Sequence, residues 1–168
     1  MLVFDIETNG LLETVSKFHC GTTINPITLE VRNYDCPLQL SEALATTDRI
    51  IGHNIIGYDI PALRILTGKH IATPRFDTLI AARLLSPEGQ HSLDVYGRKL
   101  GFPKGDYKGG WEECSDEMKK YCFRDTTLGA VLFLELVKRL RFEEQMGIPL
   151  TDIPHLQKAI RSLKYGES

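Results

Sequence analysis

Two acidic residues follow an apolar run at the start of the chain. The segment LVFDIET, residues 2–8, carries Asp5 and Glu7 on alternate positions. Side chains two residues apart on a strand point to the same side, so both carboxylates would enter one small volume. Such a pair is unfavourable at the edge of a core unless a cation neutralises it, and carboxylate oxygens suit Mg²⁺ or Mn²⁺. The pair therefore indicates a metal site, although a solvated strand end would carry the same residues.

Two further stretches place acids beside polar residues. In GHNIIGYDIPAL, residues 52–63, an apolar strand is expected to end at Asn54, and Asp59 falls in the first turn of the next helix. In KKYCFRDTTL, residues 119–128, Tyr121 and Asp125 are four residues apart and share one helix face. Each motif alone has an ordinary explanation. Acids favour the first turn of a helix, and a Tyr–Asp pair often forms a hydrogen bond between helices.

The elements that must position these residues predict an α/β fold. Short apolar runs predict strands at residues 2–8, 18–25, 29–34 and 49–54, of which the second and third form a hairpin. Helical spacing predicts helices at 37–46, 58–68, 76–85, 91–101, 116–141 and 152–166. Strands interleaved with helices predict a mixed sheet of about five strands flanked by helices. We expect a single domain over residues 1–168.

Composition sets further bounds. The chain has 168 residues, of which 42% are hydrophobic, enough for one sizeable core. Its 20 basic residues nearly balance 22 acidic ones, so net charge neither indicates nor excludes a nucleic-acid partner. No apolar run approaches the roughly 18 residues of a membrane span, and we expect a cytoplasmic protein without a membrane partner. The four cysteines lack zinc-site spacing and are expected as reduced thiols, with Cys122 in the core.

The three motifs together resemble those of the DEDD superfamily of 3′→5′ exonucleases. DIET matches the first motif, HNIIGYDIPAL the second and YCFRD the third, in the expected order and structural setting. Tyrosine in the third motif is typical of the DEDDy, DnaQ-like branch. The chain also resembles the proofreading exonuclease domain of A-family phage DNA polymerases in LLETVSKFHCG and YGRKLGFPKGDYKG. This resemblance covers most of residues 1–140.

The resemblance implies a ribonuclease H-like fold and a two-metal-ion mechanism. Such domains hydrolyse single-stranded DNA from the 3′ end to nucleoside 5′-monophosphates with two divalent cations, here Mg²⁺ or Mn²⁺. It implies that Asp5 bridges both ions, that Glu7 and Asp125 complete the first, and that Asp59 holds the second, largely through water. Tyr121 is implied to orient the attacking water together with Glu7.

The resemblance also implies contacts to the substrate. Thr8 would contact the terminal nucleotide, and either Leu11 or Leu12 would wedge beside its base, with turn packing as the alternative for these leucines. Asn54 would help to hold the substrate near the second motif.

Basic and aromatic residues before the third motif are further candidates. Lys104 and Lys108 would contact the phosphate chain, or they are solvated lysines of a glycine-rich loop. Tyr107 and Trp111 would stack on bases or anchor this loop. Additional positive charge could come from Lys119 and Arg124, and we interpret His53, His70 and His91 as structural.

Three functional alternatives follow. Only 43 residues come after Asp125, too few for a polymerase domain, so we expect a free-standing monomeric exonuclease in the cytoplasm, that of the host cell if phage-encoded. A separate polymerase is a candidate partner. The same chemistry could instead trim RNA, because nothing in the sequence visibly admits or excludes a 2′-hydroxyl. A non-catalytic nucleic-acid-binding accessory module is the remaining alternative.

Overall fold

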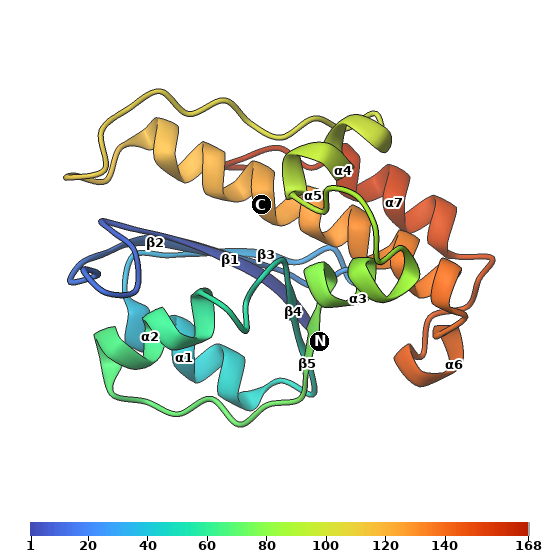
Figure 1. Ribbon diagram of the computed structural model, residues 1–168, viewed down its shortest axis with the longest axis horizontal. Helices are drawn as coiled ribbons and strands as arrows, with labels where there is room; N and C mark the ends of the chain where they lie inside the picture. Colours follow the sequence, from blue (N-terminus) through green and yellow to red (C-terminus); the bar gives the residue numbers. More distant parts are fainter. Residues whose placement is uncertain (168) are drawn as a thin grey trace.

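The computed structural model describes residues 1–167, which contain one five-stranded sheet. Its strands are β1 (Leu2–Thr8), β2 (Phe18–Ile24), β3 (Val31–Tyr34), β4 (Ile50–Gly52) and β5 (Arg75–Asp77). They lie in the order β3-β2-β1-β4-β5 (Figure 1). The pairs β1–β2 and β2–β3 are antiparallel, whereas β1–β4 and β4–β5 are parallel. The first strand of the chain is therefore central in a mixed sheet.

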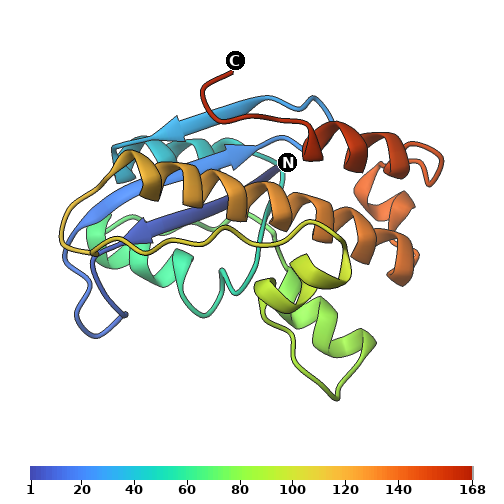
Figure 2. The same ribbon diagram turned by 90° about the horizontal axis from the view of Figure 1, so that it is seen from above.

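Helices cover both faces of the sheet. The helices are α1 (Pro37–Thr46), α2 (Asp59–Thr67), α3 (Thr78–Leu85), α4 (Leu93–Lys99), α5 (Asp116–Leu140), α6 (Glu143–Met146) and α7 (Ile153–Arg161). Helices α1 and α2 lie on one face, and α5 crosses the other with α7 beside it (Figures 1 and 2). Within residues 1–167, no helix combines the length and the apolar character that crossing a bilayer requires.

Successive residues of β1 face different layers. Val3 belongs to the hydrophobic cluster that contains Leu128 of α5, whereas Phe4 and Ile6 belong to the cluster that contains Leu40 of α1. This alternation follows from the two-residue period of a strand. The two acids of β1 therefore continue the row of Val3, which faces α5.

Helix α5 is the longest element, and it packs on the face of β1 that carries Asp5 and Glu7. Ser115 caps it by accepting a hydrogen bond at Oγ from the backbone N–H of Met118, at 3.1 Å. Asp116 lies in its first turn and Lys138 in its last, charges that suit the helix dipole. Residues 125–134 are all buried, so this part of the helix is fixed against the sheet.

The predicted fold class is confirmed, with a few local differences. Strand β5 was not predicted, because its three residues run directly into α3, where Asp77 caps the helix. The strand expected at 49–54 is shorter, since the chain turns after Gly52 and Asn54 has a positive φ of 63°. Helix α6 was also not predicted; it is a single turn.

Candidate active site

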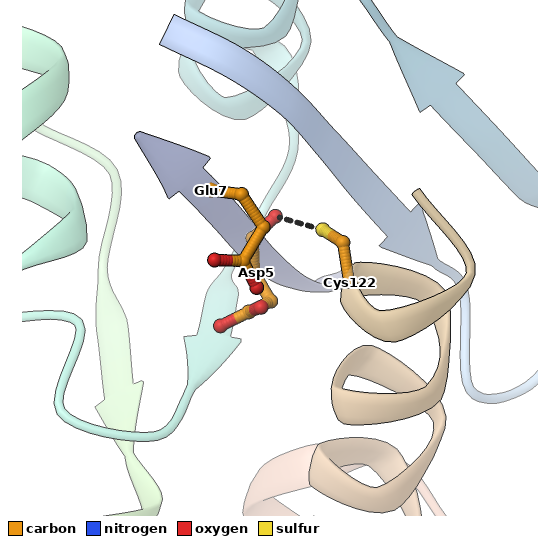
Figure 3. Close-up of side chains that lie close together, drawn as sticks. All are labelled: Asp5, Glu7 and Cys122. Atoms are coloured by element: carbon orange, nitrogen blue, oxygen red, sulfur yellow. Dashed lines mark hydrogen bonds between the residues drawn. The ribbon is translucent and has the colours of Figure 1, made fainter. Parts of the chain in front are cut away.

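The carboxylates of Asp5 and Glu7 project from the same face of β1. One side-chain oxygen of each and Sγ of Cys122 all lie within 4.8 Å of one another (Figure 3). Cys122 belongs to α5 and its Sγ–H donates a hydrogen bond to the backbone oxygen of Asp5, at 3.5 Å. This contact joins the helix to the strand directly behind the two acids.

Asp59 joins this pair from the start of α2. Its Oδ1 accepts a hydrogen bond from the backbone N–H of Ile6 at 3.2 Å, and the residue is only 4% exposed. The turn before α2 is held by Asp77, which accepts hydrogen bonds from the backbone N–H groups of Asn54, at 2.9 Å, and Ile56, at 3.0 Å. The carboxylate of Asp77 thereby fixes the path of the chain that delivers Asp59.

Asp125 and Tyr121 approach from α5. Asp125 is buried, and its Oδ1 has no hydrogen-bond partner among the described residues. Its Oδ2 lies 2.9 Å from Nζ of Lys104. The Lys104 ammonium also lies over the Tyr121 ring, at 5.0 Å from the ring centroid. The third motif is therefore paired with a lysine of the preceding loop.

The four acids share one electrostatic environment. Burial, then Glu7, Asp59 and Asp125 raise the pKa of Asp5 well above its usual range, while Lys104 opposes the shift. Burial and the nearby Asp125 raise the pKa of Glu7 to about 9. Burial raises the pKa of Asp59 to about 7 and that of Asp125 to about 6. The acids thus resist ionising together unless positive charge is added.

Two hollows open beside the acids. One, of about 640 Å³, is lined by Asp5 and Asp125 together with Lys104, Asn54 and Arg83. The arginine had not been singled out from the sequence, because an isolated arginine on a helix carries no signal.

The other hollow, of about 390 Å³, is lined by Glu7, Thr8, Leu11, Tyr58 and Trp111 among others. Its walls are largely apolar and aromatic, and Glu7, Thr8 and Asn9 add polar groups. Tyr58 had also been missed from the sequence. Its hydroxyl donates to the backbone oxygen of Gly10 and contacts the hydroxyl of Thr8.

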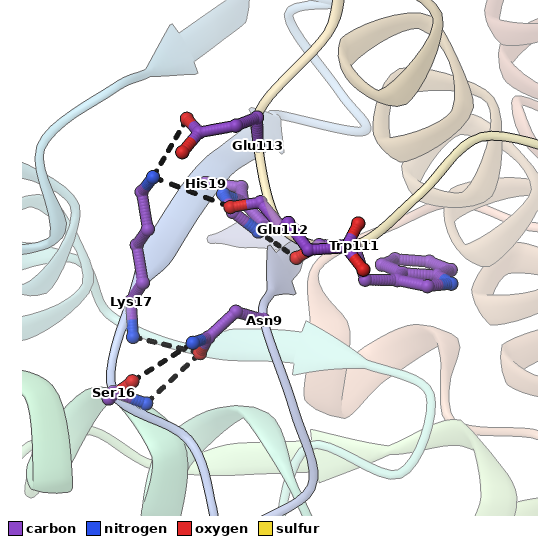
Figure 4. A network of polar contacts seen from close by, with 7 residues as sticks. All are labelled: Asn9, Ser16, Lys17, His19, Trp111, Glu112 and Glu113. Carbon is purple, nitrogen blue, oxygen red and sulfur yellow. Dashed lines mark hydrogen bonds and ion pairs between the residues drawn. The ribbon is translucent and has the colours of Figure 1, made fainter.

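Polar contacts fix the loop that carries Trp111 (Figure 4). Nε2 of His19 lies 2.7 Å from the backbone oxygen of Trp111. Nζ of Lys17 is 2.8 Å from Oε2 of Glu113. Asn9 in turn accepts hydrogen bonds from the backbone N–H groups of Ser16 and Lys17. The wall of the second hollow is therefore tied to β2 and to the turn after β1.

The predicted substrate contacts separate in the structure. Thr8 and Leu11 line the hollow beside Glu7, and Asn54 lines the hollow beside Asp5. Leu12 is partly buried and packs against the cluster under β1. Lys108 is exposed and pairs with Asp106 at 3.2 Å, on a different hollow formed by residues 106–117. It does not line either hollow beside the acids.

Two other basic candidates are engaged elsewhere. Nζ of Lys119 is 2.8 Å from Oδ1 of Asp35. The guanidinium of Arg124 lies over the ring of Phe102, at 3.5 Å from its centroid.

The donor set fits hard divalent cations. It offers four carboxylates and one unpartnered buried oxygen, Oδ1 of Asp125. Among the described residues, Lys104 is the one cation in salt-bridge contact with any of the four acids. Oxygen-rich sites with this excess of negative charge suit Mg²⁺ or Mn²⁺. By fold and site the chain is thus an α/β domain with a four-carboxylate centre at the end of its central strand.

Comparison with known proteins identifies relatives of this domain. The chain is 32% identical to the DNA-directed DNA polymerases of Escherichia phage T7 and Enterobacteria phage T3, with 70% of this chain and 21% of each polymerase covered. The chain thus spans about a fifth of the length of these polymerases. No protein-family model matches the chain.

Solved structures share the fold. Brucella melitensis NrnC superposes with a TM-score of 0.66 at 19% identity, with 96% of this chain and 81% of NrnC covered. Exonuclease X in complex with 5′ overhanging duplex DNA gives a TM-score of 0.54 at 11% identity, with 93% and 98% covered. These likenesses confirm the expected ribonuclease H-like fold. By sequence the chain is related to the phage DNA polymerases, and by fold it is similar to solved nucleases such as Exonuclease X.

Proposed function

We propose that this chain is a metal-dependent 3′→5′ exonuclease that hydrolyses single-stranded DNA from the 3′ end and releases nucleoside 5′-monophosphates. The observation that carries the proposal is the convergence of the acids of three separate motifs on one buried centre, with a tyrosine hydroxyl beside it. These residues are Asp5, Glu7, Asp59, Asp125 and Tyr121. A chain that only bound nucleic acid would gain nothing from burying four carboxylates that repel phosphate.

The four carboxylates would hold two divalent cations, Mg²⁺ or Mn²⁺. When bound, such ions make hydroxide available near neutral pH and neutralise the charge that develops on the phosphoryl group and the departing 3′ oxygen. NrnC of Brucella melitensis has been solved with bound Mg²⁺, which supports the choice of metal. The donor chemistry of Asp5, Glu7, Asp59 and Asp125 supports it independently.

Tyr121 and Glu7 would position the attacking water. The Tyr121 ring lies against Lys104, Tyr107 and Trp111, so its side chain is held in place before any substrate arrives. Orientation of a nucleophile of this kind depends on where the hydroxyl lies more than on its acidity.

The hollow beside Glu7 would receive the terminal nucleoside. Leu11 is 72% exposed and Trp111 is 42% exposed, and both line this hollow together with Tyr58. Large apolar side chains that stay exposed next to a polar centre suit the stacking of a base without selection of its identity. A frayed single-stranded 3′ end would enter this hollow more easily than a paired one.

The hollow beside Asp5 would receive the phosphate chain. Arg83 and Asn54 line it, and Arg83 forms no ion pair among the described residues. An arginine without a carboxylate partner is suited to a phosphate oxygen. Lys108 remains a candidate for a more distant phosphate.

DNA is proposed over RNA because the sequence relatives are DNA polymerases, at 32% identity. The structural neighbours give weaker guidance on the sugar. NrnC has been solved with pGG and Exonuclease X with duplex DNA, but their identities are 19% and 11%. A polymerase acting beside this chain is proposed as a partner, since in the relatives the matched region is part of a polymerase chain.

The test uses single strands labelled at the 3′ end or at the 5′ end, incubated with the protein and Mg²⁺. We expect immediate release of the 3′ label as mononucleotide and gradual shortening of the 5′-labelled strand. Neither reaction should occur in EDTA. Asp5→Asn should abolish hydrolysis. Asp48→Asn is the matched control, because Asp48 is an exposed acid at the opposite end of β4.

The same experiment separates the alternatives. If matched RNA strands are hydrolysed faster than the DNA strands, the chain is an RNA-trimming enzyme. Binding of single strands without hydrolysis in either metal would assign it to an accessory role.

A further inference from the structure

Lys104 enters the acidic centre, although it comes from a loop. Its Nζ is 2.9 Å from Oδ2 of Asp125, and it contacts the Tyr121 side chain. Its side chain is 29% exposed, and it lines the same hollow as Asp5 and Asp125. The ammonium therefore lies where the proposed function requires added positive charge.

The backbone on both sides of Lys104 is fixed against α5. Nε of Arg124 donates a hydrogen bond to the backbone oxygen of Pro103, at 2.9 Å. A Cβ atom built on Gly105 would lie 3.2 Å from Cδ2 of Tyr121 and 3.4 Å from Cγ of Arg124, so the loop packs closely on the helix here. The position of Lys104 is therefore set by the packing of its neighbours.

Lys108 lies in the same loop but, unlike Lys104, points into solvent. Its side chain is 84% exposed, and its ion-pair partner Asp106 is 77% exposed. An exposed pair of this kind contributes little and is screened by salt. One lysine of the loop is thus built into the acidic centre, and the other is solvated.

We propose that Lys104 is a tethered counter-ion, which holds Asp125 in the metal-free protein and competes with divalent cations for that carboxylate. The inference rests on the proposed function, because the competing cations are those of the exonuclease. Among the described residues no other ammonium or guanidinium group forms an ion pair with the four acids. When a divalent cation binds, the repulsion between two positive charges at one carboxylate displaces the ammonium from Asp125. Its contact with the Tyr121 ring keeps it at the site as a positioning residue for that side chain.

The test measures Mn²⁺ binding by isothermal titration at pH 8 without nucleic acid, in the intact protein, K104M, K104R and K108M. Removal of the tethered charge should tighten Mn²⁺ binding by about fivefold or more, as expected from losing a positive charge next to a divalent ion. K104R keeps the charge and should bind Mn²⁺ as the intact protein does. K108M should also leave the affinity unchanged. Unchanged or weaker Mn²⁺ binding by K104M overturns the inference.

A second measurement uses the unsubstituted protein, in case K104M does not fold. Acylation of lysines by an N-hydroxysuccinimide ester, located by mass spectrometry, should become faster at Lys104 when Mn²⁺ is added and stay constant at Lys108. Equal or slower acylation of Lys104 in Mn²⁺ also overturns the inference.

Failure of this inference is distinguishable from failure of the proposed function. If the intact protein degrades DNA and K104M binds Mn²⁺ with unchanged affinity, only the inference is wrong. If K104M binds Mn²⁺ more tightly than the intact protein but the intact protein leaves labelled DNA undegraded, only the proposed function is wrong. Absence of Mn²⁺ binding in the intact protein contradicts both.

Discussion

Oδ1 of Asp59 accepts a hydrogen bond from the backbone N–H of Ile6, at 3.2 Å, across 53 residues of sequence. Ile6 lies between the two acids of β1, so this single bond places the start of α2 against the strand that carries them. The side chain of Ile6 points away from this centre, into the cluster under the sheet. The backbone of β1 thus organises the site, while its side chains alternate between site and core.

Asp59→Asn tests the role of the charge separately from that of the hydrogen bond. The Asn side-chain oxygen can still accept from Ile6, so the fold should hold. In EDTA at neutral pH the free energy of unfolding should not fall, because the variant lacks a carboxyl whose pKa burial raises to about 7. Hydrolysis of a 3′-labelled strand should fall by about 100-fold or more, the scale typical of losing a group that stabilises the transition state. Normal activity of this variant would remove Asp59 from the proposed mechanism. Asp48→Asn should match the unsubstituted protein in both measurements.

Local signals were enough to predict most elements. The apolar run of β1, the hairpin that follows it and the Ser115 cap of α5 each depend on residues close together in sequence. The short strand β5 escaped prediction because three residues are too few to show a period. The convergence of the motifs was not predictable from spacing. It was expected only from the resemblance to known exonucleases.

Contacts made by single side chains were less predictable. Lys104 and Lys108 look alike in sequence, yet tertiary packing around Pro103 and Gly105 directs one to Asp125 and leaves the other exposed. Adjacent Leu11 and Leu12 could not be separated either. The turn after β1 exposes the first and half-buries the second.

Tyr121→Phe tests the positioning of the attacking water. The substitution removes only the hydroxyl and keeps the ring, which packs near Tyr107 at 5.6 Å between centroids and under the Lys104 ammonium. The turnover number should fall by about 10- to 100-fold, because a misplaced nucleophile is costly even when all other groups remain. The dissociation constant for Mn²⁺, measured by titration, should stay unchanged. Loss of Mn²⁺ binding would instead make Tyr121 part of the metal site.

The acidic centre predicts that the metal-free protein loses stability as pH rises. The pKa of Glu7 is raised to about 9, that of Asp59 to about 7 and that of Asp125 to about 6, so between about pH 4 and these values the folded chain binds more protons than the unfolded one. The free energy of unfolding must then fall with rising pH, by up to about 1.4 kcal/mol per pH unit for each titrating group. Urea unfolding in EDTA between pH 5 and pH 9 measures this slope.

Glu7→Gln and added Mn²⁺ provide the controls for that slope. The variant lacks one of the raised carboxyl groups, so its stability should decline less steeply with pH. Saturating Mn²⁺ should flatten the curve of the unsubstituted protein and raise its stability most at high pH, where the acids are ionised. Asp48→Asn should keep the steep slope in EDTA. A slope that Glu7→Gln does not change would place the titrating groups elsewhere.

Trp111 is the only tryptophan of the chain, so its fluorescence reports directly on the hollow beside Glu7. Binding of a short single strand in Ca²⁺, without Mg²⁺, should quench this fluorescence, because a stacked base covers the exposed indole. A strand with an abasic 3′ terminus should quench much less, and this strand is the matched control for phosphate contacts. Trp111→Ala should raise KM by about 5- to 150-fold, which corresponds to the roughly 1–3 kcal/mol of one base–aromatic stack, while Trp111→Phe should retain most of the affinity. Equal quenching by the intact and abasic strands would show that Trp111 takes no base and only anchors its loop, where its carbonyl accepts a hydrogen bond from His19.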